Sequence, residues 1–155
     1  MENRIEILRG YIDRTLLNMT DAFERRCAYL HLYGVSQACA LIALRRGQNA
    51  ELATIAGMLH DFYTYKFMDD KNHAEKGALL AREVLNELKL TNDNETDLIC
   101  SAIYNHSSKG SYHSAFDEVL VDADVLQHCL YNVTKPIMEH ENLRFERLID
   151  EFSLN

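Results

Sequence analysis

The apolar residues of this chain recur with the period of an α-helix over nearly its whole length. From Glu2 to about Asn18, apolar side chains are spaced by three or four residues, and this spacing predicts a helix with one buried face. The same spacing returns in six later segments: Thr20 or Asp21 to Gly47, Asn49 to about Asp61, Ala74 to Leu88, Leu98 to His106, Ala115 to Tyr131, and Ile137 to Phe152.

Residues that favour helix ends stand at several of these expected boundaries. The side chains of Asp21, or Thr20, and of Asn49 can accept hydrogen bonds from the free N–H groups of a helix start. Gly47 follows two arginines and is typical of a helix stop, and Pro136 suits the first position of the last helix. The polar runs between helices predict loops at Thr64–Asn72, Thr91–Asn94 and Ser107–Ser111.

These elements predict an all-α protein, a single-domain helical bundle of about six to seven helices. The sequence has no alternating strand pattern, internal repeat, low-complexity tract or linker. Its 155 residues suffice for one domain with a substantial core. One proline and six glycines leave few positions at which a helix must end.

Composition and charge narrow the classes of function. The formal net charge of −8 argues against binding double-stranded nucleic acid, because phosphate contacts need clustered basic side chains. No run approaches the roughly 18 uninterrupted apolar residues of a membrane span. Charges stand where a signal peptide would be apolar, so we expect a cytoplasmic protein outside the membrane. The cysteines lie in apolar helical patterns and are interpreted as small buried hydrophobes: Cys27, Cys39, Cys100 and Cys129.

Four polar residues fall on the apolar faces of these helices. His31, His60, His106 and Asp124 each continue a row of apolar or small side chains. A buried imidazole or carboxylate without a partner is costly, and one shared cation would serve all of them. Taken singly, a histidine on an apolar face is more often a satisfied core residue. Three histidines lack such a placement and are interpreted as surface or packing residues: His113, His128 and His140.

The order of these residues resembles the HD-domain family of metal-dependent phosphohydrolases. The pattern is His31, then Met-Leu-His-Asp at Met58–Asp61 at the end of a following helix, then Val-Asp-Ala-Asp at Val121–Asp124. The segments Asn72–Ala78 and Ala102–Ser107 are similar to the intervening segments of small bacterial members. The similarity covers about residues 24–127. It implies an HD-domain fold over the whole chain, residues 1–155, with a core at about 24–131 on which the terminal helices pack.

The resemblance also implies a metal site. It implies that four residues bind a divalent cation: His31, His60, Asp61 and Asp124. The second aspartate of the Asp122–Asp124 segment is the one that matches and the one on the inward row. His73 and His106 stand where some members hold a second metal and others only line the pocket, and the sequence leaves this open. Nitrogen and carboxylate ligands without thiolate suit Mn, Fe, Co, Ni or Mg.

The activity implied is a metal-dependent phosphohydrolase, either a phosphomonoesterase or a phosphodiesterase, acting on a small phosphate ester or nucleotide. A metal-activated water would attack phosphorus, and Asp61 would orient that water. Three lysines flank the predicted loops and are candidates to neutralise phosphate oxygens: Lys66, Lys76 and Lys109. Phe62-Tyr63-Thr64 replaces the Ile-Gly-Lys of several subfamilies, and Val125-Leu126-Gln127 replaces a more frequent Lys-Leu-Asp. These departures leave the substrate open.

Two other functions agree with the same residues. A di-iron redox enzyme would use His73 and His106 to complete a second iron site, with oxygen as a substrate. A non-catalytic module would bind a nucleotide or a partner protein through the same site. The sequence does not decide the oligomeric state, and a homodimer is one alternative.

Overall fold

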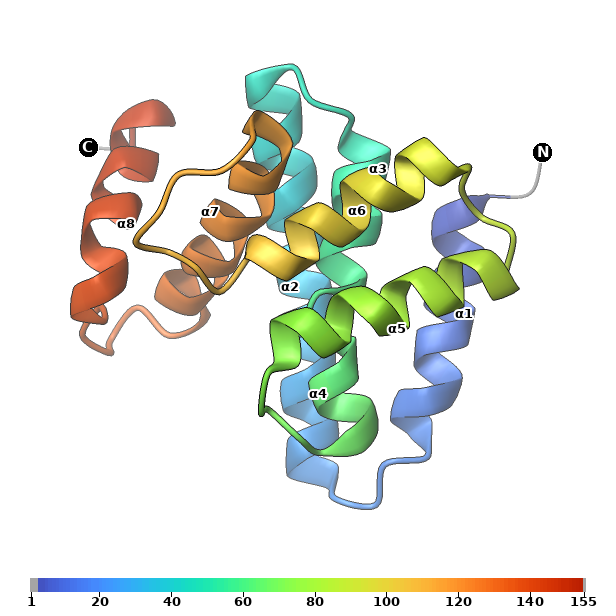
Figure 1. The fold of residues 1–155 in the computed structure, drawn as a ribbon. Coiled ribbons are helices and arrows are strands. Elements are labelled where there is room, and N and C mark those ends of the chain that lie inside the picture. Colours follow the sequence, from blue (N-terminus) through green and yellow to red (C-terminus); the bar gives the residue numbers. More distant parts are fainter. Residues whose placement is uncertain (1–2, 155) are drawn as a thin grey trace.

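The computed structural model describes residues 3–154. Within that range the chain forms eight α-helices and no strand (Figure 1). The all-α fold predicted from the sequence is therefore confirmed. The helices are α1 (Arg4–Leu17), α2 (Ala22–Arg46), α3 (Ala50–Leu59), α4 (Phe62–Phe67), α5 (His73–Glu87), α6 (Asp93–Asn105), α7 (Ala115–Tyr131) and α8 (Glu139–Glu151).

Local signals account for most helix boundaries. The carboxylate of Asp21 accepts hydrogen bonds at the start of α2, and the Asn49 side chain does the same for α3, as the sequence predicted. Gly47 ends α2 in the left-handed conformation at φ 66°, which costs glycine little. The predicted start of the first helix at Glu2 lies outside the described residues. Within the described residues, α1 begins at Arg4 with Asn3 as its cap.

The predicted loop at Thr64–Asn72 is wrong in its first half, because helix α4 runs through Phe67. Helix α4 begins just before this segment, at Phe62, and buries an aromatic side chain. Phe62 is fully buried and packs edge-on against Tyr11 of α1, with ring centroids 6.1 Å apart. This contact with a distant part of the chain stabilises a short helix that the local pattern does not predict.

Two further boundaries differ from the expectations. Pro136 does not begin the last helix, because α8 starts three residues later at Glu139 and the intervening residues remain extended along a cavity described below. Helix α6 starts at Asp93 rather than near Leu98. A capping box between Asn92 and Glu95 satisfies the free N–H groups there, so the second half of the predicted polar loop belongs to the helix.

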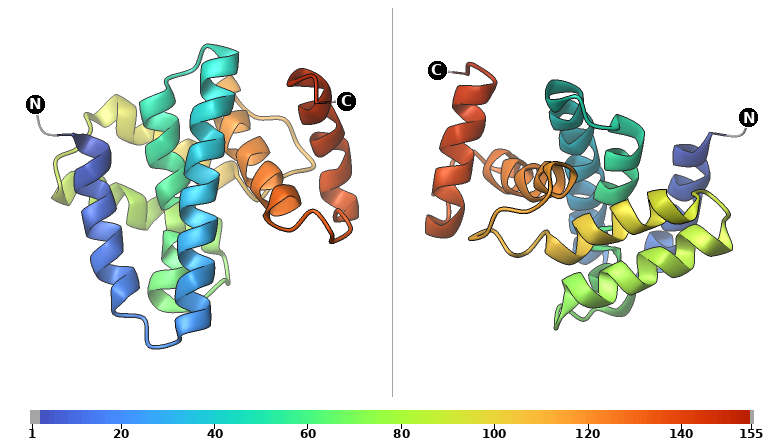
Figure 2. Two further views of the ribbon diagram at one scale, coloured as in Figure 1. Left: turned by 180° about the vertical axis from the view of Figure 1, so that it is seen from behind. Right: turned by 45° about the horizontal axis from the view of Figure 1, so that its top comes forward.

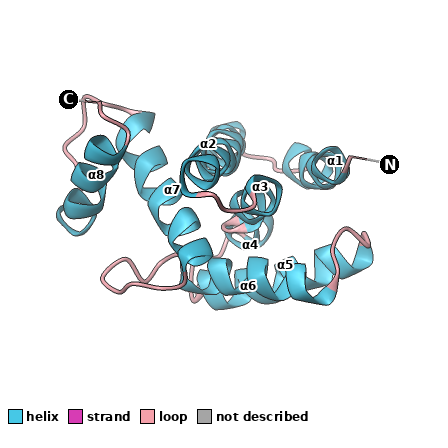
Figure 3. Ribbon diagram, turned by 90° about the horizontal axis from the view of Figure 1, so that it is seen from above, coloured by secondary structure: helices cyan, strands magenta, loops and turns pink. Residues whose placement is uncertain are grey.

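The long helix α2 is the centre of the bundle and packs against α3 and α7 (Figures 1 and 3). Helices α5 and α6 form a pair that lies across α3, α1 packs on α3 from the opposite side, and α8 packs on α7 at the far edge (Figure 2). By length and hydropathy alone α2 could cross a membrane, but 44% of its apolar window is already buried in the protein. One such helix is weak evidence for a membrane span, because core helices of soluble proteins pass the same test.

Small residues let α2 and α3 approach closely. A Cβ atom added at Gly57 would lie 2.6 Å from the Cα of Ser36, so only glycine fits at this crossing. The close approach brings the end of α3, with its polar residues, against the middle of α2. Of the four cysteines, all of which are free, Cys39 and Cys100 are buried as predicted, whereas the other two are partly exposed: Cys27 and Cys129.

Candidate metal centre

His60 and Asp61 lie at the junction between α3 and α4, where the chain turns inside the bundle. The His60 side chain is fully buried, and its Nδ1 lies 2.7 Å from the carbonyl oxygen of Gly57. The N–H at Nδ1 donates to that carbonyl, so the lone pair of Nε2 faces the interior. Asp61 follows directly and extends its carboxylate into the same space.

His31 of α2 and Asp124 of α7 meet this pair from two other helices. His31 Nε2 lies 3.1 Å from Asp61 Oδ2, 3.5 Å from Asp124 Oδ1 and 3.0 Å from His60 Nε2. The Nδ1 of His31 donates to Gln127 Oε1 at 2.8 Å. Gln127 is one of the departures from the usual family pattern, and here it fixes the ring of His31.

Two more histidines approach the other oxygen of Asp61. His106, at the end of α6, places Nε2 3.3 Å from Asp61 Oδ1, and its Nδ1 donates to the carbonyl of Ile103 at 2.6 Å. His73, at the start of α5, places Nε2 3.6 Å from the same oxygen, with Nδ1 3.1 Å from the carbonyl of Asp70. Asp61 therefore presents one oxygen to each of two pairs of histidines.

This arrangement fits a cation better than any set of internal hydrogen bonds. All four histidines use Nδ1–H on an oxygen acceptor, so their Nε2 lone pairs converge. Two such lone pairs 3.0 Å apart, on His31 and His60, repel each other unless a positive charge lies nearby. Asp61 Oδ1 and Asp124 Oδ1 are buried without a hydrogen-bond partner, which is costly unless something else is bound.

The pKa values of the cluster favour anionic carboxylates. Burial by itself would raise the pKa of Asp61, but His60, His106 and His31 outweigh it and hold that pKa well below its usual range. Burial would likewise raise the pKa of Asp124, and His60 with Lys109 holds it far below normal. Burial lowers the pKa of His60, whereas the contacts with Asp61 outweigh burial and raise the pKa values of His31 and His106. Neutral histidine and ionised carboxylate are the forms that bind metals.

A second set of polar residues supports Asp124 from the outer side. Lys109, in the loop between α6 and α7, places Nζ 2.8 Å from Asp124 Oδ2 and 2.6 Å from Glu141 Oε1 of α8. His128 contacts both carboxylates, with Nε2 3.3 Å from Asp124 Oδ1 and Nδ1 2.8 Å from Glu141 Oε1. Its ring also stacks on that of His31, 5.2 Å away.

His128 and Glu141 are functional candidates that the sequence interpretation missed. The sequence interpretation gave His128 no place at the centre, whereas in the structure it contacts Asp124 and stacks on His31, with its side chain 32% exposed. Its spacing of four residues from Asp124 on α7 is the signal that could have found it. Glu141 is 1% exposed but lies on a helix with no local sign of a site.

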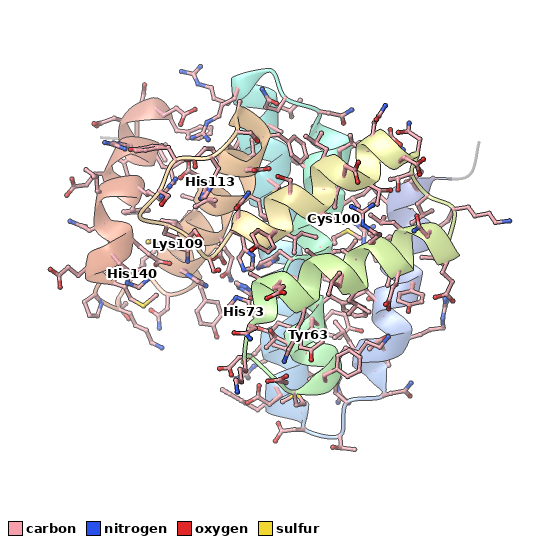
Figure 4. The ribbon with its side chains drawn as sticks, viewed as in Figure 1. Tyr63, His73, Cys100, Lys109, His113 and His140 are labelled. Atoms are coloured by element: carbon pink, nitrogen blue, oxygen red, sulfur yellow. The ribbon has the colours of Figure 1, made fainter. Side chains whose placement is uncertain are left out.

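The three lysines predicted to contact phosphate lie in different places and have different partners. Lys109 lies at the cluster, but it is paired with two carboxylates. Lys66 lies over aromatic rings, with Nζ 5.5 Å from the centroid of Phe67, and within residues 3–154 no contact joins it to the histidines. Lys76 pairs with Asp69 at 2.8 Å. Figure 4 shows His73 at the start of α5 and Lys109 in the loop before α7, with His113 and His140 on the side of that loop and α8.

Three groups of side chains in the described part of the chain have the spacing needed to hold a metal ion. They share members: His31, His60 and Asp61; Asp61, His73 and His106; and His31, Asp124 and His128.

The cluster holds three carboxylates, Asp61, Asp124 and Glu141, against one lysine. A divalent cation would balance that excess of negative charge. A cavity of about 550 Å³ reaches the cluster at His31 and Asp61.

The fold and the site define a helical-bundle protein with a buried histidine and carboxylate centre suited to a divalent metal. A family model described as "HD domain" matches residues 28–129, and the chain belongs to this family. The identification made from the sequence is thereby confirmed. No curated protein and no solved structure matches the chain.

Proposed function

We propose that this protein is a metal-dependent phosphohydrolase acting on a small phosphate ester or nucleotide. The observation that carries the proposal is the convergence of four histidine Nε2 atoms on Asp61, beside two buried carboxylate oxygens that lack hydrogen-bond partners. Family membership supports hydrolase chemistry for such a centre. The activity and the substrate are our inference.

His31, His60, Asp61 and Asp124 would hold the first divalent cation, and His73 and His106 would hold a second through Asp61 Oδ1. The nitrogen and oxygen donors suit Mn, Fe, Co, Ni or Mg. A cation bound there supplies Lewis acidity, which polarises a phosphoryl oxygen and acidifies a water molecule. The ligand geometry is fixed by backbone carbonyls behind three of the histidine rings, at Gly57, Asp70 and Ile103.

The remaining roles belong to residues around the ligands. Asp61 stays ionised and, when a single cation is bound, can orient a water molecule through its other oxygen. Lys109 holds Asp124 Oδ2 and leaves Oδ1 for the cation, so we propose that it positions Asp124 rather than contacting phosphate. Lys66, which lies on aromatic rings instead, receives no role in this proposal.

One observation favours a second candidate function. The group of Asp61, His73 and His106 also has the spacing needed to hold a metal ion, and a di-iron redox enzyme requires a second metal. Two irons per chain and a spectrum that changes with oxygen would favour that function. Tight nucleotide binding without turnover under any metal would favour a non-catalytic module.

The test is elemental analysis of the purified protein followed by a phosphatase panel with each candidate metal added. We expect at least one metal per chain and turnover of a phosphate ester. Asp61→Asn should abolish both, because Asp61 contacts every histidine of the cluster's two pairs. Asp97→Asn is the matched control, since Asp97 pairs with Arg82 on the surface. Failure to load any metal, or full activity of Asp61→Asn at stoichiometric protein, would overturn the proposal.

We also propose that the whole chain acts as one domain in the cytoplasm. Glu141 of α8 contacts Lys109 and His128 at the centre, so the last helix belongs to the site although it lies beyond the matched residues. Four free cysteines suit a reducing compartment. Sedimentation of the purified protein would decide between a monomer and a homodimer.

A further inference from the structure

The cavity that reaches the metal centre has an unusual lining. At its inner end lie His31 and Asp61, with His128 and Glu141 nearby. Its walls come from three separate segments: the first half of α2, helix α4, and the end of α7 with the chain that leads to α8. The side chains on these walls are mostly apolar or aromatic: Phe23, Leu30, Tyr65, Tyr131, Ile137 and Met138.

These wall residues are left uncovered by the protein itself. Phe23 is 60% exposed, Tyr131 52% and Met138 48%, although all three surround one opening. Single exposed apolar residues need no explanation, whereas a group of them around a polar centre marks a binding surface. The size of the cavity, about 550 Å³, is that of a small-molecule site.

Charge restricts what the cavity can accept beyond one phosphoryl group. Lys135 is the sole lysine or arginine among the described residues that line it. Lys109, behind the ligands, is already paired with Asp124 and Glu141. A triphosphate carries several charges that would each need a cationic partner, and the lining supplies only Lys135.

The extended chain before α8 completes this cavity. Ile137 and Met138 precede the helix start at Glu139, and Glu141 follows on the first turn, where it holds His128. The same short segment thus supplies apolar wall and support for the centre. This explains why Pro136 lies outside the helix, since an earlier helix start would withdraw these side chains.

We infer that the site takes phosphate monoesters whose alcohol part carries an aromatic or apolar group, seated against Phe23, Leu30 and Ile137 with the phosphoryl group at His31 and Asp61. The inference rests on the proposed function and adds to it the class of substrate. It excludes nucleoside triphosphates and hydrophilic sugar phosphates as preferred substrates. Phe23, Leu30 and Ile137 are then specificity-determining residues.

Binding of two phosphonates to the Mn-loaded protein tests the inference without any turnover. Phenylphosphonate and methylphosphonate present the same charged group and differ in the aromatic ring. Isothermal titration should give at least tenfold tighter binding of phenylphosphonate. Phe23→Ala should reduce that preference to threefold or less, with methylphosphonate affinity and metal content unchanged. Phe67→Ala is the matched control, because Phe67 is a 53% exposed ring outside the cavity, and it should keep the full preference.

The outcomes separate this inference from the proposed function. Equal binding of the two phosphonates, no binding of either, or a preference that survives in Phe23→Ala overturns the inference. So does tighter binding of ATP than of phenylphosphonate. Rapid hydrolysis of glycerol 3-phosphate, at or above the kcat/KM of phenyl phosphate, sinks the substrate class but leaves the phosphohydrolase standing. A clear phenyl preference with no hydrolysis of any ester supports the cavity and contradicts the proposed function.

Discussion

Two aspartates on the same helix, Asp122 and Asp124 of α7, are both buried and yet belong to different kinds of polar cluster. Asp122 receives Arg46 Nη2 at 2.7 Å on one oxygen and Arg144 Nη1 at 2.9 Å on the other. Asp124 receives Lys109 on Oδ2, while Oδ1 faces three histidines without a hydrogen bond. Burial alone therefore does not distinguish a structural carboxylate from a ligand.

The two aspartates differ in whether their partners neutralise the carboxylate charge and supply a hydrogen bond to each of its oxygens. Around Asp122, two arginines meet three carboxylates and a set of carbonyl oxygens, and they tie α8 to α2 and α7. That cluster is a brace. Around Asp124 the histidines turn lone pairs inward and oxygen atoms remain unpaired. A cation bound there, as we propose, would complete the cluster.

The largest expected effect separates the two aspartates directly. Asp124→Asn should reduce bound metal below detection and lower turnover by on the order of a thousandfold, because the cation supplies several kcal/mol of transition-state stabilisation. Asp122→Asn should keep both metal and turnover and lose only stability. Elemental analysis and steady-state kinetics of the two variants check this. Equal metal loss in both would break the comparison.

A smaller effect is expected at the crossing that brings the metal ligands together. Gly57→Ala forces a Cβ to within 2.6 Å of the Ser36 backbone, so α2 and α3 must separate. We expect the free energy of unfolding to fall by about 2–3 kcal/mol, with weaker metal binding because His60 moves away from His31. Urea unfolding measures the change in the free energy of unfolding. Gly10→Ala, whose Cβ meets only a flexible side chain at 3.7 Å, should not destabilise the protein.

A substitution in the cluster around Asp122 should lower stability without changing the metal content. Arg46→Met removes a guanidinium that holds Asp122 and Glu151. We expect a loss of about 2 kcal/mol in the free energy of unfolding, less than for a fully buried pair because the Arg46 side chain is 24% exposed. Metal content should not change. Loss of metal at unchanged stability would show that the two clusters are not separate.

The smallest effect concerns the outer side of the metal centre. His128→Asn should weaken metal binding by about tenfold, the low end of what supporting residues contribute, because the ring no longer packs on His31 or faces Asp124. Competition with a chromogenic chelator measures the change. His140→Asn, on the exposed side of α8, is the control and should have no effect.

The sequence by itself determined the helices and the order of the candidate ligands. Helical period and caps such as Asp21 and Asn49 are local, so they can be predicted from neighbouring residues. The inward placement of His31, His60, His106 and Asp124 follows from the same period. The choice of Asp124 over Asp122 as the candidate ligand also came from the sequence, and in the structure Asp122 is paired with two arginines.

Only the tertiary structure decided which other residues join the centre. Helix α4 forms because Phe62 packs on Tyr11, 51 residues earlier in the chain. Lys109 and Glu141 are 32 residues apart and meet because α8 packs on α7, whereas Lys66 lies on aromatic rings away from the histidines. These contacts depend on how distant helices pack, and the local pattern of a sequence carries no record of that geometry.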